Sequence, residues 1–244
     1  MILAVLQARM SSVRLPAKVL APVLGVPLIL RAVERINFAS MLDGLVLATS
    51  TDASDDELAE VASASGIRVA RGSLTDVLGR FLDVVEEVRP AHVVRLTGDN
   101  ALIDPRVIDK VVEAHLASGA DYTSNTLKRT YPRGLDVEVV TSSALRTVGR
   151  LAVDGPEREH VTMGIYHRPR SFSLRSVTQV PDRSEWRWTV DLPGDLSFVR
   201  AVYAELYAEG ARFGQEEIVE LLRRRPELVR TEADAERSGG AHVS

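Results

Sequence analysis

The first half of the chain alternates short apolar runs with segments whose apolar residues recur at helical spacing. Continuous apolar runs are typical of strands that are buried on both faces of a sheet. Amphipathic segments between them are typical of helices that cover such a sheet. We therefore predict strands at residues 2–8, 44–50, 67–70 and 92–99, and helices at residues 27–36, 55–66, 75–88 and 104–119.

Residues with known preferences for helix ends support several of these boundaries. Pro27 suits the first turn of its helix, and Gly66 suits the end of the next one. Asp104 can cap the fourth helix and Pro105 can begin it. A regular alternation of strand and helix predicts an α/β fold, in which a parallel sheet is covered by helices on both faces.

The second half of the chain has a less regular pattern. Residues 134–140 and 171–180 resemble strands of a mixed sheet edge or arm, and residues 186–191 a further strand; helices are predicted at residues 157–168, 195–210 and 215–225. The last stretch, "TEADAERSGGAHVS", lacks an apolar pattern. We expect one domain over residues 1–230 with an arm at about 121–180, followed by a disordered tail at 231–244.

Composition narrows the class of protein. The chain has 244 residues, of which 45% are apolar, which is enough for one sizeable core. A net charge of −4 disfavours broad binding to nucleic acid or membranes. The absence of cysteine excludes disulfides and thiolate metal sites. No apolar run approaches the ~20 residues of a membrane span, and "MILAVLQARM" lacks the basic start and cleavage site of a signal peptide, so we expect a cytoplasmic protein.

A cationic loop directly follows the first predicted strand. The stretch "QARMSSVRLPAKVL" (residues 7–20) contains Arg9, Arg14 and Lys18. Parallel sheets bind ligands at the carboxyl ends of their strands, and these side chains donate strong hydrogen bonds to phosphate oxygens. The spacing suits a triphosphate, although neither "GxxxxGK" nor "GxGxxG" is present. The alternative is a solvated basic loop whose charges have gathered by chance.

Two aspartates end predicted strands. Asp99 follows the fourth strand in "LTGDN", and Asp191 ends "WRWTVD". Mg²⁺ is commonly held by one or two carboxylates together with substrate phosphates. A cationic loop beside two such carboxylates favours metal-assisted phosphoryl or nucleotidyl transfer. The alternative for each aspartate is a helix cap, because both precede predicted helices.

Weaker signals surround these residues. The turns "STD" (50–52) and "RGS" (71–73) have the small, polar residues that let a nucleoside approach the backbone, or that ordinary turns use. Two charged stretches could build an acceptor pocket or form a solvated, salt-bridged arm. Their charged and aromatic residues are Tyr131, Arg133, Asp136, Glu138, Arg158, Glu159 and His160. No covalent nucleophile is evident, because cysteine and a "GxSxG" elbow are both absent.

These segments together resemble a known family. "QARMSSVRLPAKVL", "RGSLTDVLGRF", "LTGDNALIDP", "YPRGLDVEVV", "EREHVT" and "WRWTVDLPGDL" occur in family order over about residues 1–210. The chain resembles the cytidylyltransferases that include CMP-acylneuraminate and CMP-KDO synthetases, and most of all the branch named after spore-coat polysaccharide biosynthesis proteins. The resemblance implies a three-layer nucleotide-diphospho-sugar-transferase-like fold, with a mixed, mainly parallel sheet and an arm through which two chains form a homodimer.

The resemblance also implies an activity and roles for particular residues. Members of the family transfer CMP from CTP to an acceptor and release pyrophosphate, with Mg²⁺ or Mn²⁺. By resemblance, Arg9, Arg14 and Lys18 hold the CTP phosphates, and Asp99 and Asp191 bind the metal, so that Arg9, Lys18 and the two aspartates form the catalytic set. The nucleotide side is lined by Thr49, Asp52, Arg71, Gly72 and Thr97. The acceptor side comprises Asn100, Tyr131, Arg133, Asp136, Glu138, Glu159, His160 and Trp188.

The chain departs from the family pattern at a few positions. Ser11 and Ala17 stand where the family usually has glycine, and Val13 where it has threonine. Arg133 stands where the family usually has an acidic or neutral residue, so we predict an anionic acceptor bound by Arg133 and Arg158. Two other functions stay open: a glycosyltransferase of the same fold class, which would want a "DxD" where this chain has "TGDN", and a non-catalytic nucleotide-binding protein.

Overall fold

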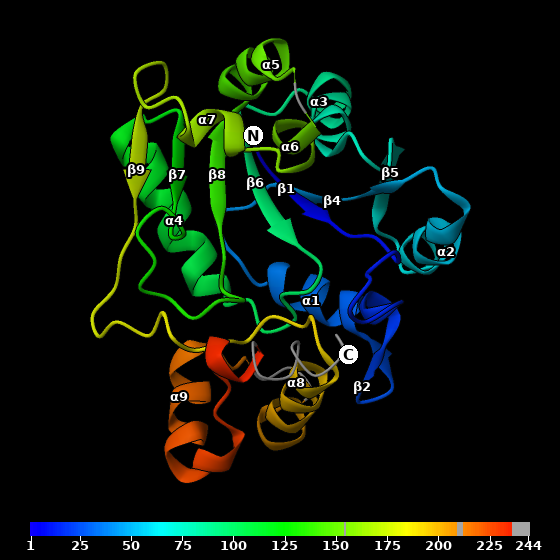
Figure 1. Ribbon diagram of the computed structural model, residues 1–244, viewed down its shortest axis with the longest axis vertical. Coiled ribbons are helices and arrows are strands. Elements are labelled where there is room, and N and C mark those ends of the chain that lie inside the picture. Colours follow the sequence, from blue (N-terminus) through cyan, green and yellow to red (C-terminus); the bar gives the residue numbers. More distant parts are fainter. Residues whose placement is uncertain (154, 209–211, 236–244) are drawn as a thin grey trace, which may run out of the picture.

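The computed structural model describes residues 1–153, 155–208 and 212–235, and it is built on one seven-stranded sheet. The strand order is β5-β4-β1-β6-β8-β7-β9 (Figure 1). Within the described residues β8 alone runs against its neighbours. The strands are β1 (Ile2–Gln7), β4 (Gly44–Ser50), β5 (Arg68–Gly72), β6 (His92–Thr97), β7 (Tyr122–Ser124), β8 (Glu138–Thr141) and β9 (Leu174–Ser176).

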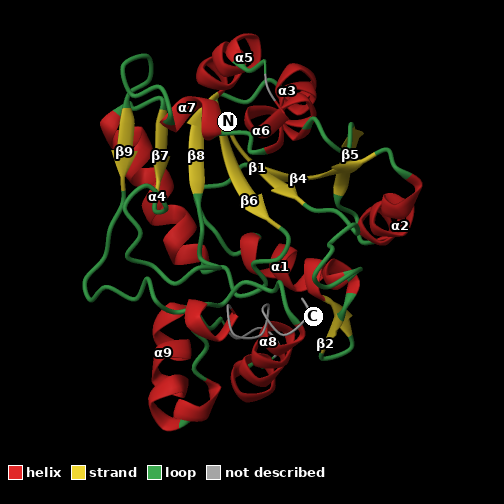
Figure 2. Cartoon of the chain, viewed as in Figure 1, coloured by secondary structure: helices red, strands yellow, loops and turns green. Residues whose placement is uncertain are grey.

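Helices cover both faces of this sheet (Figure 2). Successive residues of β1 point to opposite faces, so Ala4 and Leu6 join one apolar cluster while Leu3 and Val5 join another. The first cluster packs against α1 (Leu28–Ile36), α2 (Asp56–Ala64) and α4 (Pro105–Ser118). The second packs against α3 (Val77–Val88), α5 (Ser142–Leu151), α6 (Gly155–Glu159) and α7 (Met163–Tyr166).

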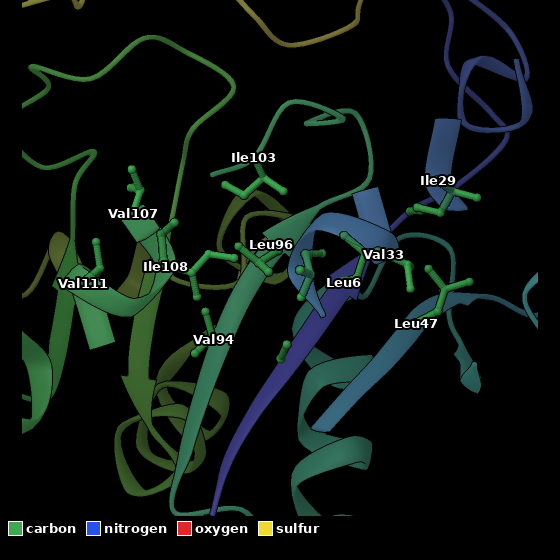
Figure 3. Packing of buried hydrophobic residues seen from close by; sticks show 14 of the residues in the cluster. Leu6, Ile29, Val33, Leu47, Val94, Leu96, Ile103, Val107, Ile108 and Val111 are labelled. Carbon is green, nitrogen blue, oxygen red and sulfur yellow. The ribbon is translucent and has the colours of Figure 1, made fainter. Parts of the chain in front are cut away.

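The first cluster shows why the strands read as continuous apolar runs. Figure 3 shows Leu6, Val94 and Leu96 from neighbouring strands packed beside Ile29 and Val33 of α1. All but Val33 are at most 2% exposed. A strand with one helical layer on each face has no solvent side, so it has no polar alternation.

A third apolar cluster lies outside the sheet, around the fully buried Trp188. It joins α8 (Pro193–Leu206) and α9 (Gln215–Arg224), which lie side by side below the sheet in Figure 1. The remaining elements are the short hairpin β2 (Pro22–Val23) and β3 (Val26–Pro27), and the 3-10 helices η1 (Lys18–Leu20), η2 (Ala53–Asp55) and η3 (Pro226–Leu228).

The strand order places a binding crevice between β1 and β6. The chain moves outward from β1 to β4 and β5, and then returns to β6 on the other side of β1. Ligands bind where the order of a parallel sheet reverses in this way. Gln7 is opposite Thr97, so the two strands end level with one another. At Gly98 a Cβ would lie 2.8 Å from the Cβ of Ala8, so glycine lets the two following loops begin in contact.

The predicted mixed, mainly parallel sheet is confirmed, and every predicted element of the first half is present within a few residues. Two helices start at residues other than the predicted ones. The predicted helix 55–66 begins as η2 before α2, and the helix predicted at 195–210 begins at Pro193, with residues 209–211 outside the described part. Proline at a first turn explains the earlier start of α8.

The second half requires larger corrections. The predicted strand 186–191 is not part of the sheet, because this extended segment makes only isolated bridges to Arg133 and Thr231. The predicted helix 157–168 is two short helices, since Val161 between them has a left-handed backbone (φ 35°). The predicted strands 134–140 and 171–180 shorten to β8 and β9.

The segment 121–180 also contains two unpredicted elements, β7 and α5. Thr141 caps α5, its hydroxyl accepting a hydrogen bond from the backbone of Ala144 (3.1 Å). Strands β7 to β9 extend the main sheet, and α5 packs against α3 and β8. Helices therefore cover strands of this segment, and the arm and the homodimer through it stay a prediction.

The first residues of the segment 231–244, which we predicted to be a disordered tail, are ordered. Residues 231–235 contact the folded chain, most notably through Glu232, which pairs with two arginines. Residues 236–244 lie outside the described part. Of the helices in the described part, none has the length and apolar character needed to cross a membrane.

A buried histidine pair gives the fold a measurable pH dependence. His92 Nδ1 and His115 Nε2 are 3.0 Å apart, and His115 Nδ1 lies 3.0 Å from the hydroxyl of Thr123. Burial, together with the charge of His92, lowers the pKa of His115 to about 4. The folded protein thus binds this proton less readily than the unfolded chain, whose histidines have a pKa of about 6.5. The stabilisation is complete above pH 6.5 and is lost as the pH falls toward 4.

We expect this site to lower the free energy of unfolding by about 2 kcal/mol between pH 7.5 and pH 5. Urea unfolding of the wild type and of His115→Gln at both pH values measures this loss, because the glutamine at position 115 of the variant does not bind a proton. The exposed His167→Gln is the control and should keep the wild-type pH dependence. An equal pH dependence in His115→Gln and the wild type would contradict the assignment.

Candidate active site

A cavity of about 620 Å³ opens where the crevice between β1 and β6 was expected. The loop after β1 forms one wall, and the ends of β6 and of the 186–191 segment form the others. Nine of the predicted site residues line it: Arg9, Arg14, Lys18, Thr97, Asp99, Arg133, Glu159, His160 and Asp191.

Lys18 lies at the centre of the charged groups. Its Nζ donates to Asp99 Oδ2 (3.0 Å), to Asp191 Oδ1 (2.8 Å) and to the carbonyl oxygen of Val190 (2.7 Å). These contacts use all three donors of an ammonium group. Ala17 precedes it with a left-handed backbone (φ 56°), which costs a residue with a Cβ about 1–2 kcal/mol. The ammonium therefore holds two carboxylates from distant parts of the chain beside each other.

Asp191 is surrounded by cations. Its Oδ2 lies 2.6 Å from Arg187 Nη2 and 3.1 Å from Arg14 Nη2, in addition to the contact of Oδ1 with Lys18. Burial alone would raise the pKa of Asp191, but Lys18, Arg187 and Arg14 lower it below its ordinary value. The carboxylate is therefore ionised at neutral pH.

Neither aspartate caps a helix, so the structure excludes that alternative. The N-cap position of α8 is Leu192, and the carboxylate of Asp195 in the first turn accepts hydrogen bonds through Oδ2 from the backbones of Asp191 and Leu192, both at 3.0 Å. The cap of α4 is Asp104, which accepts from the backbone of Arg106 (2.8 Å). The carboxylates of Asp99 and Asp191 instead face the cavity.

The donor set fits a divalent cation that is also held by substrate. Asp99 Oδ1 accepts from the hydroxyl of Thr97 (2.7 Å), and the side chain is 26% exposed. Carboxylate oxygens are ligands that Mg²⁺ prefers. In the described part of the chain, no three or more His, Cys, Asp or Glu side chains gather into a metal site. Two carboxylates beside a cationic loop are what an ion shared with a triphosphate requires.

The other cations of the cavity differ in how firmly they are held. Arg14 is 59% exposed, and Arg9 contacts Glu159 at 3.5 Å. Arg80 of α3 was not predicted as a site residue, yet it lines the cavity while only 3% exposed. Burial lowers the pKa of Arg80. Its position among the apolar residues of an amphipathic helix was the one signal that sequence reasoning could have used.

A second cavity of about 400 Å³ shares Arg95 and His160 with the first. Two residues predicted for the acceptor side, Asp136 and Glu138, line it together with residues that were not predicted. The unpredicted lining residues are Arg95, Thr126, Leu127, Arg129, Thr162 and Tyr166.

Both carboxylates of the second cavity are already paired. Asp136 contacts Arg129 at 2.5 and 3.0 Å. Glu138 lies opposite Arg95 in the register of β8 and β6 and forms an ion pair with it. Glu138 also accepts from the hydroxyl of Tyr122 (2.6 Å). Burial would raise the pKa of Glu138, but Arg95 and the hydroxyl groups of Thr162 and Tyr122 lower it, so Glu138 is ionised. The carboxylate thereby fixes the guanidinium of Arg95 between the two cavities.

Several predicted nucleotide-side residues do not line either cavity. Thr49 is fully buried, and Asp52 accepts from the backbone of Ser54 (2.9 Å) at the start of η2. Arg71 is bound to Asp56 (2.6 Å), and Gly72 belongs to β5. Asp52 and Arg71 form hydrogen bonds within the turns after β4 and β5, which is the alternative that the sequence left open for these turns.

The acceptor side also requires corrections. Trp188 is fully buried in the cluster around α8 and α9, Asn100 is 4% exposed, and Tyr131 lines a separate cavity beside Lys110. Their side chains are core residues and do not line the two cavities described above. Arg158 is bound to the carboxylate of Asp76 and to the carbonyl oxygen of Gly149, so it is not gathered with Arg133 around one anion.

Arg133 lines the main cavity but has an internal partner. Its Nε lies 2.5 Å from Glu232 Oε1. The next residue, Gly134, has a φ of 111°, and a Cβ there would lie 2.5 Å from the carbonyl carbon of Trp188. Glycine is therefore required for the turn that brings Arg133 beside the 186–188 segment.

Known proteins share this architecture. The family model described as Cytidylyltransferase matches residues 3–217. The spore coat polysaccharide biosynthesis protein SpsF of Bacillus subtilis is 35% identical over 243 residues, covering 96% of this chain and 99% of that protein. A 3-deoxy-manno-octulosonate cytidylyltransferase of Geobacter metallireducens is 33% identical over 129 residues, covering 52% of this chain and 49% of that protein.

The fold of this chain is also similar to that of a solved cytidylyltransferase structure. A cytidylyltransferase from Leptospira borgpetersenii superposes with a TM-score of 0.88 at 28% identity, covering 93% of this chain and 96% of that one. The mixed, mainly parallel sheet of this chain is thus part of a fold that it shares with a solved cytidylyltransferase. The chain belongs to the cytidylyltransferase family and is a CTP-dependent nucleotidyltransferase.

Proposed function

We propose that this protein transfers CMP from CTP to an anionic acceptor, with release of pyrophosphate, and that Mg²⁺ or Mn²⁺ is required. The observation that carries the proposal is the contact of Lys18 with both Asp99 and Asp191 inside a cavity lined by Arg9 and Arg14. A triphosphate needs cations, and a divalent ion needs carboxylates. The cavity supplies cations and carboxylates, and the two carboxylates both contact the ammonium of Lys18.

In the proposed reaction an acceptor oxygen attacks the α-phosphorus of CTP. The new phosphorus–oxygen bond forms as the bond to pyrophosphate breaks, and the leaving group takes that electron pair. Arg9, Arg14 and Lys18 hold the phosphates in place and stabilise the developing negative charge. Asp99 and Asp191 would hold the divalent ion, which when bound withdraws charge from the phosphate oxygens.

We place the acceptor in the second cavity, because it adjoins the main cavity through Arg95 and His160. Histidine is a common proton acceptor near neutral pH, so His160 is the candidate base for the acceptor hydroxyl. Arg95, which lines both cavities, and Arg133, which lines the main cavity, are the guanidinium groups that we propose for a carboxylate, phosphate or phosphonate on the acceptor. Measuring pyrophosphate release with four nucleotides against a panel of acidic acceptors tests the proposal, and we expect CTP with an anionic acceptor to be fastest.

Arg14→Ala should weaken the binding of CTP more than the binding of CMP, because CMP lacks the β- and γ-phosphates. We expect a loss of about fivefold for CTP, since a contact from an exposed side chain is worth about 1 kcal/mol. Calorimetry with both nucleotides measures the difference. The control is Arg68→Ala, an exposed arginine that pairs with Glu87 away from the cavity. Equal losses for CTP and CMP would move Arg14 away from the terminal phosphates.

A further inference from the structure

The C-terminal segment, residues 229–235, lies against the extended segment that carries Asp191. The backbone amide of Arg187 donates to the carbonyl oxygen of Arg230 (2.8 Å), and Trp186 forms an antiparallel bridge with Thr231. On the opposite edge, Trp188 donates its backbone amide to the carbonyl oxygen of Arg133 (2.6 Å). Three segments that are far apart in the sequence thus lie side by side below the sheet, where the end of the described chain reaches the yellow segment in Figure 1.

This backbone pairing places the carboxylate of Glu232 against two arginines. Arg133 Nε lies 2.5 Å from Glu232 Oε1, and Arg187 Nη1 lies 3.2 Å from both oxygens of Glu232. The same Arg187 donates from Nη2 to Asp191 Oδ2 at 2.6 Å. Glu232 is therefore connected to Asp191 through one guanidinium group.

Among these contacts, the guanidinium of Arg187 is the group that depends on the charge of Glu232. Its side chain is only 3% exposed, so each of its donors needs a protein acceptor. Asp195 also contacts the guanidinium of Arg187, at 3.3 Å, and it is fixed by the backbone amides of Asp191 and Leu192 and by Arg230 (3.2 Å). Without the charge of Glu232, Nη1 has a weaker acceptor, and the guanidinium can turn toward Asp195 and away from Asp191.

We infer that Glu232 is a positioning residue of the nucleotidyl-transfer site. It holds Arg187, and Arg187 holds the carboxylate of Asp191 in the orientation that faces Lys18 and the cavity. Glu232 lies beyond residues 3–217, the part that the family model matches. The inference rests on the proposed function, because it assigns to Asp191 the binding of a metal ion together with CTP.

The test measures CTP binding by calorimetry with and without Mn²⁺, for the wild type, Glu232→Gln and Glu232→Asp. We expect Glu232→Gln to raise the Kd of CTP in the presence of Mn²⁺ by fivefold to tenfold and to leave the metal-free Kd within twofold. Glu232→Asp keeps the charge and should recover part of the loss. The control, Glu227→Gln, removes an exposed carboxylate of the same C-terminal region that pairs with Arg225, and should behave as the wild type.

Two outcomes would overturn the inference. One is Glu232→Gln binding CTP with Mn²⁺ as tightly as the wild type, and the other is an equal loss with and without the metal, which indicates a general structural role. A separate outcome concerns the proposed function: if the wild type itself binds CTP equally with and without Mn²⁺, the metal requirement fails, and the role of Glu232 fails with it.

Discussion

Lys18→Met is expected to lower turnover by about 10³-fold, more than any other substitution in the loop after β1. Methionine keeps most of the length and apolar stem of lysine but removes the ammonium that joins Asp99 and Asp191. Fixed donors in a cavity that develops charge are each worth about 10²–10³-fold in rate. The ammonium of Lys18 also lies between two carboxylates and offsets their repulsion. We therefore expect a larger loss from this variant than from other substitutions in the loop. Steady-state rates of pyrophosphate release at saturating CTP measure the loss.

Stability gives a second measurement of the same variant. Removal of the buried ammonium leaves the carboxylates of Asp99 and Asp191 close together without the cation between them, which should cost about 2 kcal/mol of folding free energy. Added Mg²⁺ should raise the unfolding temperature of Lys18→Met more than that of the wild type, because the ion can replace the lost charge. Lys110→Met removes a lysine that does not line the main cavity and is the control. Turnover of Lys18→Met within tenfold of the wild type would show that the ammonium is only structural.

The second large effect is expected from Asp99→Asn, with a loss of turnover of at least about 10²-fold. Asp99 is part-exposed and contacts one cation and one hydroxyl, so its amide leaves little charge unbalanced and the fold should persist. Asp191→Asn should lose as much turnover but also stability, because three cations surround that carboxylate. Rates over a range of Mg²⁺ concentrations and thermal unfolding together separate the two effects.

The matched control for these substitutions is Asp109→Asn. Its carboxylate accepts hydrogen bonds from the backbones of Ser40 and Met41 on the surface, away from the cavity. Its turnover should match that of the wild type. If Asp99→Asn or Asp191→Asn keeps nearly wild-type rates at saturating metal, then that carboxylate does not bind the ion, and the Lys18 contacts serve the fold alone.

Family membership decides between the functions that the sequence had left open. A glycosyltransferase or a non-catalytic nucleotide-binding protein could share the parallel sheet and the cationic loop. The family model covers residues 3–217, and a relative of nearly the same length aligns over 96% of the chain. In the proposed function, the residues that would select the acceptor are others, in the second cavity and around Arg133.

The sequence by itself determined the first half of the fold and the location of the site. Buried parallel strands and amphipathic helices have strong local patterns, and their alternation leaves few topologies. Because parallel strands end at the same edge, residues that follow β1 and β6 had to meet, as Arg14 and Asp99 do at the main cavity. This conclusion needs no knowledge of side-chain contacts.

Only the tertiary structure decided which charged residues act together. The carboxylates of Asp195 and Asp104, and not those of Asp191 and Asp99, accept from the backbone at the starts of α8 and α4, although all four aspartates lie close to a helix start. Arg158 pairs with Asp76, 82 positions away, instead of joining Arg133.

Glu232 belongs to a stretch whose composition predicts disorder, yet the backbone of the 185–187 segment pairs with it and Arg187 binds its carboxylate. The physical reason is the same in each case. Local periodicity fixes how a segment folds, whereas an ion pair between distant residues depends on where the packed core places both ends of the chain.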